Sequence, residues 1–164
     1  MYKAGDIVVH KHDICKIIDI KKKFRLDEDY YTLIPVDDST LIIHTPVSDK
    51  RGLIRNIITK EAAEALIQKI PEIETIKVDD DRLLENEYIK AINSGKHENL
   101  IKIIKTTYLR KVEKINNGKK VGEKDKNYFR LAEKLFYTEF SAALGMSYQE
   151  TKKYVENKVA ELVK

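Results

Sequence analysis

The spacing of hydrophobic positions changes once along the chain, near residue 58. Before this point, hydrophobic residues form short runs rich in β-branched side chains, and polar turn residues separate the runs. Beyond it, hydrophobic residues recur at every third or fourth position, which is the spacing of one helix face. The pattern predicts an α+β protein with two domains, a strand-rich domain over residues 1–57 and a helical domain over residues 58–164.

The strand-rich domain contains closely spaced hydrophobic runs over residues 6–10, 14–20, 30–36 and 40–45. Short β-prone runs divided by turn residues are typical of a small antiparallel barrel. The stretch 21–29 is polar and lacks Gly and Pro, so we expect the end of a long hairpin there. Pro35 lies inside a run and indicates an edge strand or a bulge, whereas Pro46 should end the strand before it.

A small open barrel leaves one strand edge without a partner, and such an edge can accept a strand from another protein. Residues 40–45 are the candidate edge strand, with Pro46 closing it. The alternative is that this strand is fully paired inside the barrel, which its β-branched residues also allow.

Five helical stretches follow, over residues 60–70, 80–93, 100–115, 124–144 and 147–163. Pro71 should stop the first stretch, and Asp80 or Asp81 can cap the second. Gly145 should end the fourth, and residues 147–150 match a capping box that opens the fifth. Because the connections are short, we expect a compact all-α bundle of about five helices.

Composition narrows the functional classes. Hydrophobic residues make up 42% of the chain and charged residues 35%, which is typical of a folded protein with a highly charged surface. No apolar run reaches the roughly 18 residues of a membrane span, and the N-terminus lacks the apolar core of a signal peptide. Cys15 is the single cysteine, so no internal disulfide can form, and we expect a cytoplasmic protein without membrane association.

The net charge of +4 is too small to indicate nucleic-acid binding by itself, but the charges are unevenly distributed. Residues 72–87 hold seven acidic side chains and two basic ones, whereas residues 96–130 hold eleven basic side chains and four acidic ones. Solvated helix faces of opposite charge explain this pattern as well as a phosphate-facing patch does. The candidate members of such a patch are Lys102, Lys105, Lys114, Lys119, Lys120, Lys124, Lys126 and Arg130. Tyr108 and Tyr128 lie among them at a helical spacing more typical of core residues than of stacking platforms.

The sequence contains little that indicates catalysis. His10 and His12 would share one face of a strand, and a third ligand such as His44 or Asp13 would complete a metal site. A metal-dependent enzyme is therefore one hypothesis, although two histidines on an exposed strand explain the pair equally simply. Cys15 lies in an apolar run and is expected to be a small buried hydrophobic residue, not a nucleophile. No phosphate-binding loop, dinucleotide motif or nucleophile elbow is present.

Several short motifs, in a fixed order over nearly the whole chain, resemble the CarD/CdnL family of bacterial RNA polymerase-binding proteins. Residues 2–10 (YKAGDIVVH) are similar to the opening strand of that family, and Tyr30-Tyr31 follows. The runs that complete the match are IIHTPV at 42–47, GLIR at 52–55, INSG at 92–95 and GEK at 122–124.

The resemblance implies a Tudor-like barrel that docks on the β subunit of RNA polymerase by strand addition, and a helical domain that contacts promoter DNA and stabilises the open complex. The chain would then be a transcription regulator and not an enzyme, without metal, cofactor or small-molecule substrate, and associated with the nucleoid through RNA polymerase. The polymerase-facing residues that the resemblance implies are Leu41, Ile42, Ile43, His44, Thr45 and Pro46. His44 stands where the family often has Arg.

The DNA-facing part departs from the family pattern. Family members often carry a Trp at the start of the second helix of the helical domain, where it wedges into DNA. Here Asp81 occupies that place, and a carboxylate repels phosphate. Either a weak DNA contact has moved to the basic stretch, or the protein is a polymerase-interaction module with little or no DNA binding. The candidate DNA-binding residues are Arg82, Lys119, Lys120, Lys124, Lys126 and Arg130.

Overall fold

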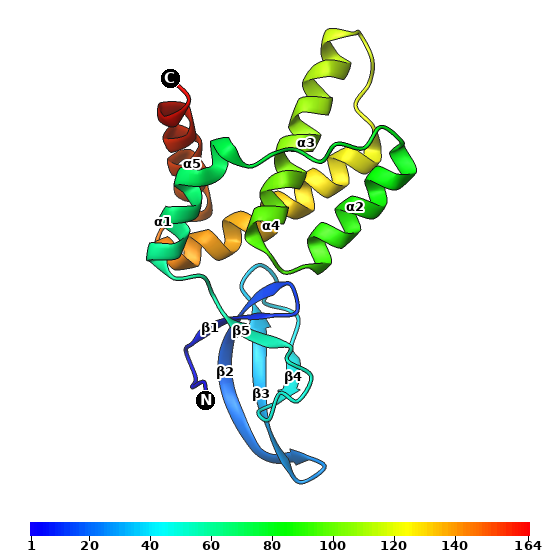
Figure 1. Ribbon diagram of the computed structural model, residues 1–164. Helices are drawn as coiled ribbons and strands as arrows, with labels where there is room; N and C mark the ends of the chain where they lie inside the picture. The colour runs from blue at the N-terminus through cyan, green and yellow to red at the C-terminus, as the bar shows by residue number, and fades with distance from the viewer. The chain divides into compact units, whose positions relative to one another are not determined.

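The computed structural model describes all residues, Met1–Lys164, and divides into two compact units, Met1–Thr59 and Lys60–Lys164. The division lies close to the expected boundary between residues 57 and 58. Figure 1 shows all strands in the first unit and all helices in the second, as the change in hydrophobic spacing predicts. The α+β fold class is therefore confirmed.

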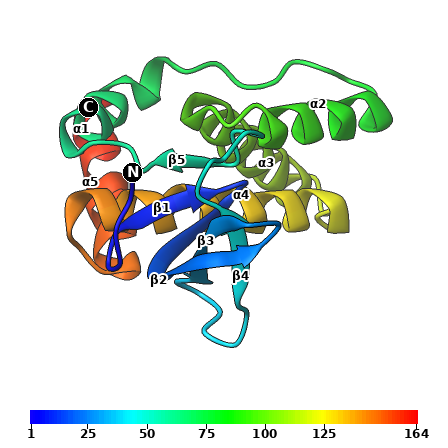
Figure 2. The same cartoon turned by 90° about the horizontal axis from the view of Figure 1, so that it is seen from below.

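The first unit is one antiparallel sheet of five strands in the order β4-β3-β2-β1-β5 (Figure 2). Its strands are β1 (Ile7–His10), β2 (Asp13–Arg25), β3 (Glu28–Pro35), β4 (Ile43–Pro46) and β5 (Ile54–Asn56). The hydrogen-bonded order is not closed, so β4 and β5 are the two edges. The antiparallel sheet is confirmed, whereas a Tudor-like barrel is not confirmed, because the sheet does not close.

The long hairpin expected over residues 21–29 is present between β2 and β3. Its turn consists of Leu26 and Asp27, whose φ angles are 49° and 58°. Two consecutive positive φ angles match the twist of a tight hairpin, and the register shifts twice along β2, which increases that twist further. The Leu26 side chain is 90% exposed, so the turn buries no apolar surface.

Pro35 does not mark an edge strand, because β3 lies between β2 and β4. Val36 N–H donates to Ile14 O at 2.9 Å, so the neighbouring position 35 directs its backbone nitrogen away from β2. On that other side, β4 pairs with β3 only as far as Leu33. A missing N–H at residue 35 therefore costs no ladder bond, and the proline is tolerated at the end of an inner strand.

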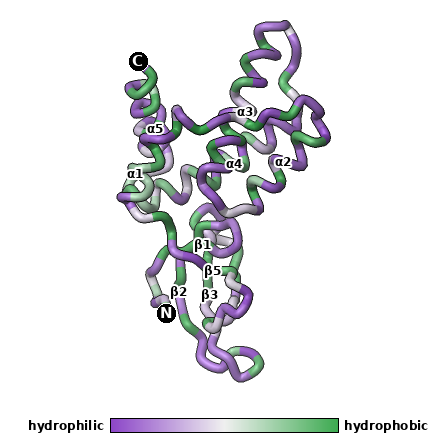
Figure 3. The backbone as a smooth tube through the Cα atoms, in the orientation of Figure 1, coloured by the Kyte–Doolittle hydropathy of each residue, from purple (hydrophilic) through white to green (hydrophobic).

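One hydrophobic cluster of the sheet unit consists of Val8, Cys15, Ile17, Tyr31 and Leu33. These residues pack together, and Cys15 with Ile17 and Tyr31 with Leu33 are alternate positions of their strands, which share one face of a sheet. Figure 3 shows hydrophobic and hydrophilic residues interspersed along the strands. Cys15 is fully buried, and burial, followed by the charges of Asp13 and Asp37, raises the pKa of its thiol to about 11. The prediction that Cys15 is a small buried hydrophobic residue is confirmed.

The second unit contains the five predicted helices. They are α1 (Lys60–Lys69), α2 (Asp81–Asn93), α3 (His97–Asn116), α4 (Glu123–Leu144) and α5 (Tyr148–Leu162), with a 3₁₀ turn at Ile70–Glu72. The Asp80 side chain accepts hydrogen bonds from the first turn of α2, and Ser147 and Glu150 form the predicted capping box. Gly145 ends α4 with a φ of 68°, a conformation that favours glycine.

Helix α4 organises the bundle. It packs along α3, with further contacts to α5, α1 and α2. Its Phe136 and Phe140 rings stack with centroids 4.1 Å apart, and Ala132 packs in a second cluster with Leu84 and Tyr88 of α2. None of the helices is both long enough and apolar enough to cross a membrane.

Candidate functional site

The edge strand β4 is the first candidate binding site. It pairs with β3 on one side only, between Ile43–Leu33 and Pro46–Tyr30. The alternative, a fully paired inner strand, is therefore wrong. The strand begins only at Ile43 and is shorter than the expected run, because a turn over residues 38–41, closed by a hydrogen bond from Leu41 N–H to Asp38 O at 3.3 Å, precedes it.

The register shows which main-chain groups face the open edge. Val47 N–H donates to Asp29 O at 2.9 Å, just beyond the last ladder pair. Since bonded and non-bonded pairs alternate along an antiparallel ladder, the N–H and C=O of Thr45 and Ile43 point to β3. Those of His44 then point outward, where an added strand can bond to them. Pro46 offers no N–H, so pairing cannot extend beyond it in that direction.

Side chains next to this edge divide into packed and exposed groups. Ile43 packs against the sheet core, and the His44 ring lies against the Phe24 ring with centroids 4.7 Å apart. His44 Nδ1 also lies 3.3 Å from Thr32 Oγ1. Leu41 and Ile42, in contrast, are 46% and 57% exposed. The edge thus combines a free backbone at His44 with two exposed aliphatic side chains, which suits docking of an extended segment.

The six candidate DNA-binding residues are all exposed. Arg82 lies in the first turn of α2, and Lys119 and Lys120 lie in the loop between α3 and α4. Lys124, Lys126 and Arg130 follow within the first turns of α4. Five of the six therefore lie at or near the start of α4, and Arg82 lies on α2.

Ion pairs reduce the charge that this group offers to phosphate. Lys124 Nζ lies 3.6 Å from Glu85 Oε2 of α2, and Lys126 Nζ lies 3.5 Å from Glu123 Oε1. Lys105, another expected member of the patch, is excluded from it. Its Nζ donates to the backbone oxygens of Ile70 at 2.9 Å and Ile73 at 2.6 Å, so it holds the segment after α1 in place.

Asp81, which stands in the place of the family's Trp, belongs to an ion-pair network. Arg110 of α3 donates from Nη2 to Asp81 Oδ1 at 3.1 Å and from Nε to Asp125 Oδ2 at 2.8 Å. The Tyr88 hydroxyl donates to the other oxygen of Asp125 at 3.1 Å. The network joins the first turn of α2, the middle of α3 and the first turn of α4.

The network also shifts the pKa values of its members. Burial, followed by the Asp125 carboxylate, raises the pKa of the Tyr88 phenol. Burial alone would lower the pKa of Arg110, but its hydrogen bonds to Asp125 and Asp81 outweigh this effect and raise it. Arg110 is therefore a permanent cation engaged by two carboxylates. Its pairing with Asp125 was missed by the sequence interpretation, because an acid among lysines indicates only a solvated helix turn.

The histidine pair does not form the expected ligand set. Strand β1 ends at His10, which is 6% exposed, and His12 lies in the following turn and is exposed. The two rings therefore do not share a strand face, and no group of three His, Cys, Asp or Glu side chains is arranged to hold a metal ion. The geometry gives the metal-dependent enzyme hypothesis no support.

Tyr108 differs from its expected place in the core. Its side chain is 56% exposed on α3, and Leu109 and Ile115 of the same helix are 55% and 56% exposed. Tyr128, in contrast, packs against the Tyr88 ring with centroids 5.1 Å apart, as its spacing predicts. The end of α3 thus presents an aromatic ring and aliphatic side chains that the bundle leaves uncovered.

No family model matches this chain, and no curated protein matches it either. The features that bear on its function are the open strand edge, the charged surface of the helical unit and the sequence motifs.

Proposed function

We propose that this chain is a CarD-like transcription regulator, which binds the β subunit of RNA polymerase through β4 of a Tudor-like sheet domain. In this proposal its helical unit makes a weak contact with promoter DNA and modulates the stability of the open complex. The observation that carries the proposal is the open edge of β4, where the His44 backbone faces outward beside exposed Leu41 and Ile42. The same residues lie in the motif that resembles the family's docking strand.

Binding to the isolated β-subunit lobe tests this proposal directly. Ile42→Asp should weaken binding about tenfold or more, because truncating or charging an interface anchor costs over about 1.4 kcal/mol. Ile18→Asp is a matched control, since Ile18 of β2 is 44% exposed and lies away from this edge. Absence of binding by the folded wild-type protein would remove the basis of the proposal.

Amide hydrogen exchange tests the mode of binding separately. If a polymerase strand adds to β4, the His44 N–H becomes hydrogen-bonded and its exchange should slow in the complex. The Thr45 N–H already faces β3 and should change less. Binding without protection at His44 would show that the two proteins meet through another surface.

A polymerase-interaction module with little or no DNA binding is the second candidate function. It is favoured by the contacts of Asp81 with Arg110 and of Glu85 with Lys124, which place acidic groups beside the basic residues. Titration of salt against binding of a forked promoter duplex distinguishes the two functions. A contact with phosphates gives a falling log affinity with rising log salt, whereas the module gives no such dependence.

Charge reversal locates the contact if there is one. Replacing Lys119, Lys120 and Lys124 by Glu should weaken DNA binding and leave polymerase binding unchanged, since none of them lies in the sheet unit. The control is reversal of three other exposed lysines of the helical unit, Lys69, Lys153 and Lys164. Equal losses of DNA affinity in both variants would show that binding depends only on net charge, and not on the position of the lysines around the start of α4.

A further inference from the structure

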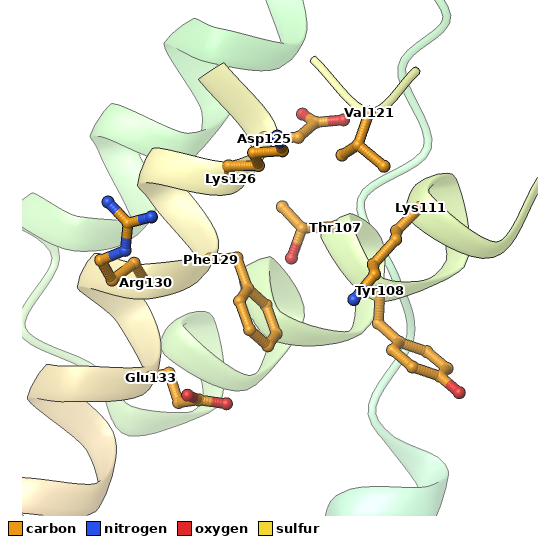
Figure 4. Close-up of a pocket in the computed structure, with 9 residues that line it drawn as sticks. All are labelled: Thr107, Tyr108, Lys111, Val121, Asp125, Lys126, Phe129, Arg130 and Glu133. Atoms are coloured by element: carbon orange, nitrogen blue, oxygen red, sulfur yellow. The ribbon is translucent and has the colours of Figure 1, made fainter. Parts of the chain in front are cut away.

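A pocket between α3 and α4 is not accounted for by the docking edge. It has a volume of about 380 Å³. Figure 4 shows the Phe129 ring and the Lys111 side chain directed into the space between the two helices. The pocket is lined by Thr107, Tyr108, Lys111, Val121, Asp125, Lys126, Phe129, Arg130 and Glu133.

The charges around this pocket are unbalanced in favour of cations. Asp125 is already bonded to Arg110 and Tyr88, and Glu133 Oε1 accepts a hydrogen bond from Lys152 Nζ at 3.1 Å. Lys111 and Arg130 form no ion pair in the structure. Both carboxylates of the lining therefore have partners elsewhere, while two cations on opposite helices remain available to an anion.

Each helix supplies an aromatic residue within one helical turn of its cation in the sequence. On α3, Lys111 lies one turn after Tyr108, and on α4, Arg130 directly follows Phe129. Aromatic faces that accept a base, beside lysine or arginine that accepts a phosphate, are the elements with which proteins bind single-stranded nucleic acid. The exposed fraction of Tyr108, 56%, shows that its ring is accessible from solvent.

The size of the pocket favours a nucleotide over a protein segment. A helix with its side chains has a diameter of about 10–12 Å, so it would lie across a hollow of this volume without entering it. Pockets for small ligands begin at about 300 Å³. One base can enter a hollow of this size, and its sugar and phosphate would extend toward Lys111 and Arg130 of the lining.

We propose that this pocket receives one nucleotide, with its base against Phe129 and its phosphate between Lys111 and Arg130. The inference deepens the proposed function and rests on its DNA contact, since it assigns to the helical unit a site for an unpaired promoter strand. The site differs from the start of α2, where the sequence resemblance would place the DNA wedge. The nucleotide can belong to a single strand or be free in solution, and the chemistry of recognition is the same.

The test uses the full-length protein and a short fluorescent oligothymidylate, with the matching duplex and thymidine monophosphate as further arms. Phe129→Ala should weaken binding of the single strand about tenfold, because stacking on an aromatic side chain contributes that much per base. Binding of the duplex should change little. Phe129→Trp retains a stacking surface and should retain affinity. Leu131→Ala, on the same helix but outside the pocket lining, is the matched control.

Since Phe129 is half-buried, circular dichroism must show that each variant is folded, and a second pair of variants avoids the core entirely. Lys111→Glu and Arg130→Glu change exposed residues, and each should reduce the salt dependence of single-strand binding by about one phosphate contact. Displacement of the oligonucleotide by thymidine monophosphate would identify free nucleotide as the source, and failure of displacement would identify the strand.

Three results would overturn the inference. The first is that Phe129→Ala binds the single strand with wild-type affinity. The second is that this variant loses affinity for the single strand and for the duplex equally. The third is that oligoglutamate displaces the oligonucleotide at equal charge, which would indicate an acidic protein segment. Polymerase binding by the same variants is measured separately. It remains intact if only the pocket assignment fails, whereas its absence in the wild type would contradict the proposed function instead.

Discussion

Substitution of Asp125 provides the sharpest test of how the helical unit is held together. The Asp125 side chain is 7% exposed and connects Arg110 of α3 to Tyr88 of α2. Asp125→Ala removes the acceptor from both. Removal of one partner from a buried ion pair costs about 3–5 kcal/mol, and an unpaired buried hydroxyl costs about 1–3 kcal/mol.

The expected loss of stability lies near the lower end of the sum of these two costs, because Arg110 is 26% exposed and its guanidinium can be hydrated after the change. We therefore expect Asp125→Ala to lower the free energy of unfolding by about 4 kcal/mol. Tyr88→Phe, which loses a single hydrogen bond, should cost about 1 kcal/mol. Asp81→Ala removes a carboxylate that is 78% exposed, so it should cost at most about 1 kcal/mol.

Urea unfolding followed by far-ultraviolet circular dichroism measures these differences. The α-helices all lie in residues 60–164, so the helical signal reports on the unit that contains the network. Asp125→Asn serves as a milder variant if Asp125→Ala does not fold, since it keeps the volume and one acceptor oxygen. A loss below about 1 kcal/mol for Asp125→Ala, or an equal loss for Asp81→Ala, would refute the reasoning.

Three further changes test other parts of the structure. Burial, followed by the charge of Lys11, lowers the pKa of His10 in the folded state, so the unfolded chain binds a proton more readily. Stability should therefore fall as pH drops below about 6.5. The melting temperature of His10→Asn should fall less than that of the wild type between neutral and mildly acidic pH. Lys105→Met should cost about 2 kcal/mol in urea unfolding, because backbone carbonyls after α1 lose a charged donor, whereas Lys102→Met should be close to neutral. Ser147→Ala should cost about 1 kcal/mol by loss of the capping box, and a change below a few tenths would show that α5 does not depend on its cap.

Features set by neighbouring residues could be predicted from the sequence. The five helices follow from apolar residues at helical spacing, and their ends follow from local chemistry at Asp80, Gly145 and Ser147. The hairpin end in the polar stretch 21–29 was predicted for the same reason, since a hairpin connects strands that are adjacent in sequence. These predictions needed no information about distant parts of the chain.

Features set by distant residues could not be predicted in the same way. Whether a sheet of short strands closes depends on how its first and last strands meet, and β4 and β5 remain separate edges here. Lys105 has the pattern of a solvated lysine, but it reaches carbonyls more than thirty residues earlier. Tyr108 has helical spacing, yet no partner covers its position on α3, so it stays exposed. Spacing predicts which residues share a face, not whether another element covers it.

The contacts of Asp81 change the meaning of the acidic and basic stretches. As separate runs, residues 72–87 and 96–130 suggest two surfaces of opposite charge. In the structure, Asp81 and Glu85 instead bind Arg110 and Lys124, so the two stretches neutralise each other where α2 meets α3 and α4.

Replacing Asp81 by Trp would consequently not be a simple return to the family's wedge, because it would also take one carboxylate from Arg110. Lys111 and Arg130, two cations without acidic partners, line the pocket on the other side of Asp125. A contact with nucleic acid therefore meets less competition from carboxylates between α3 and α4 than at the start of α2.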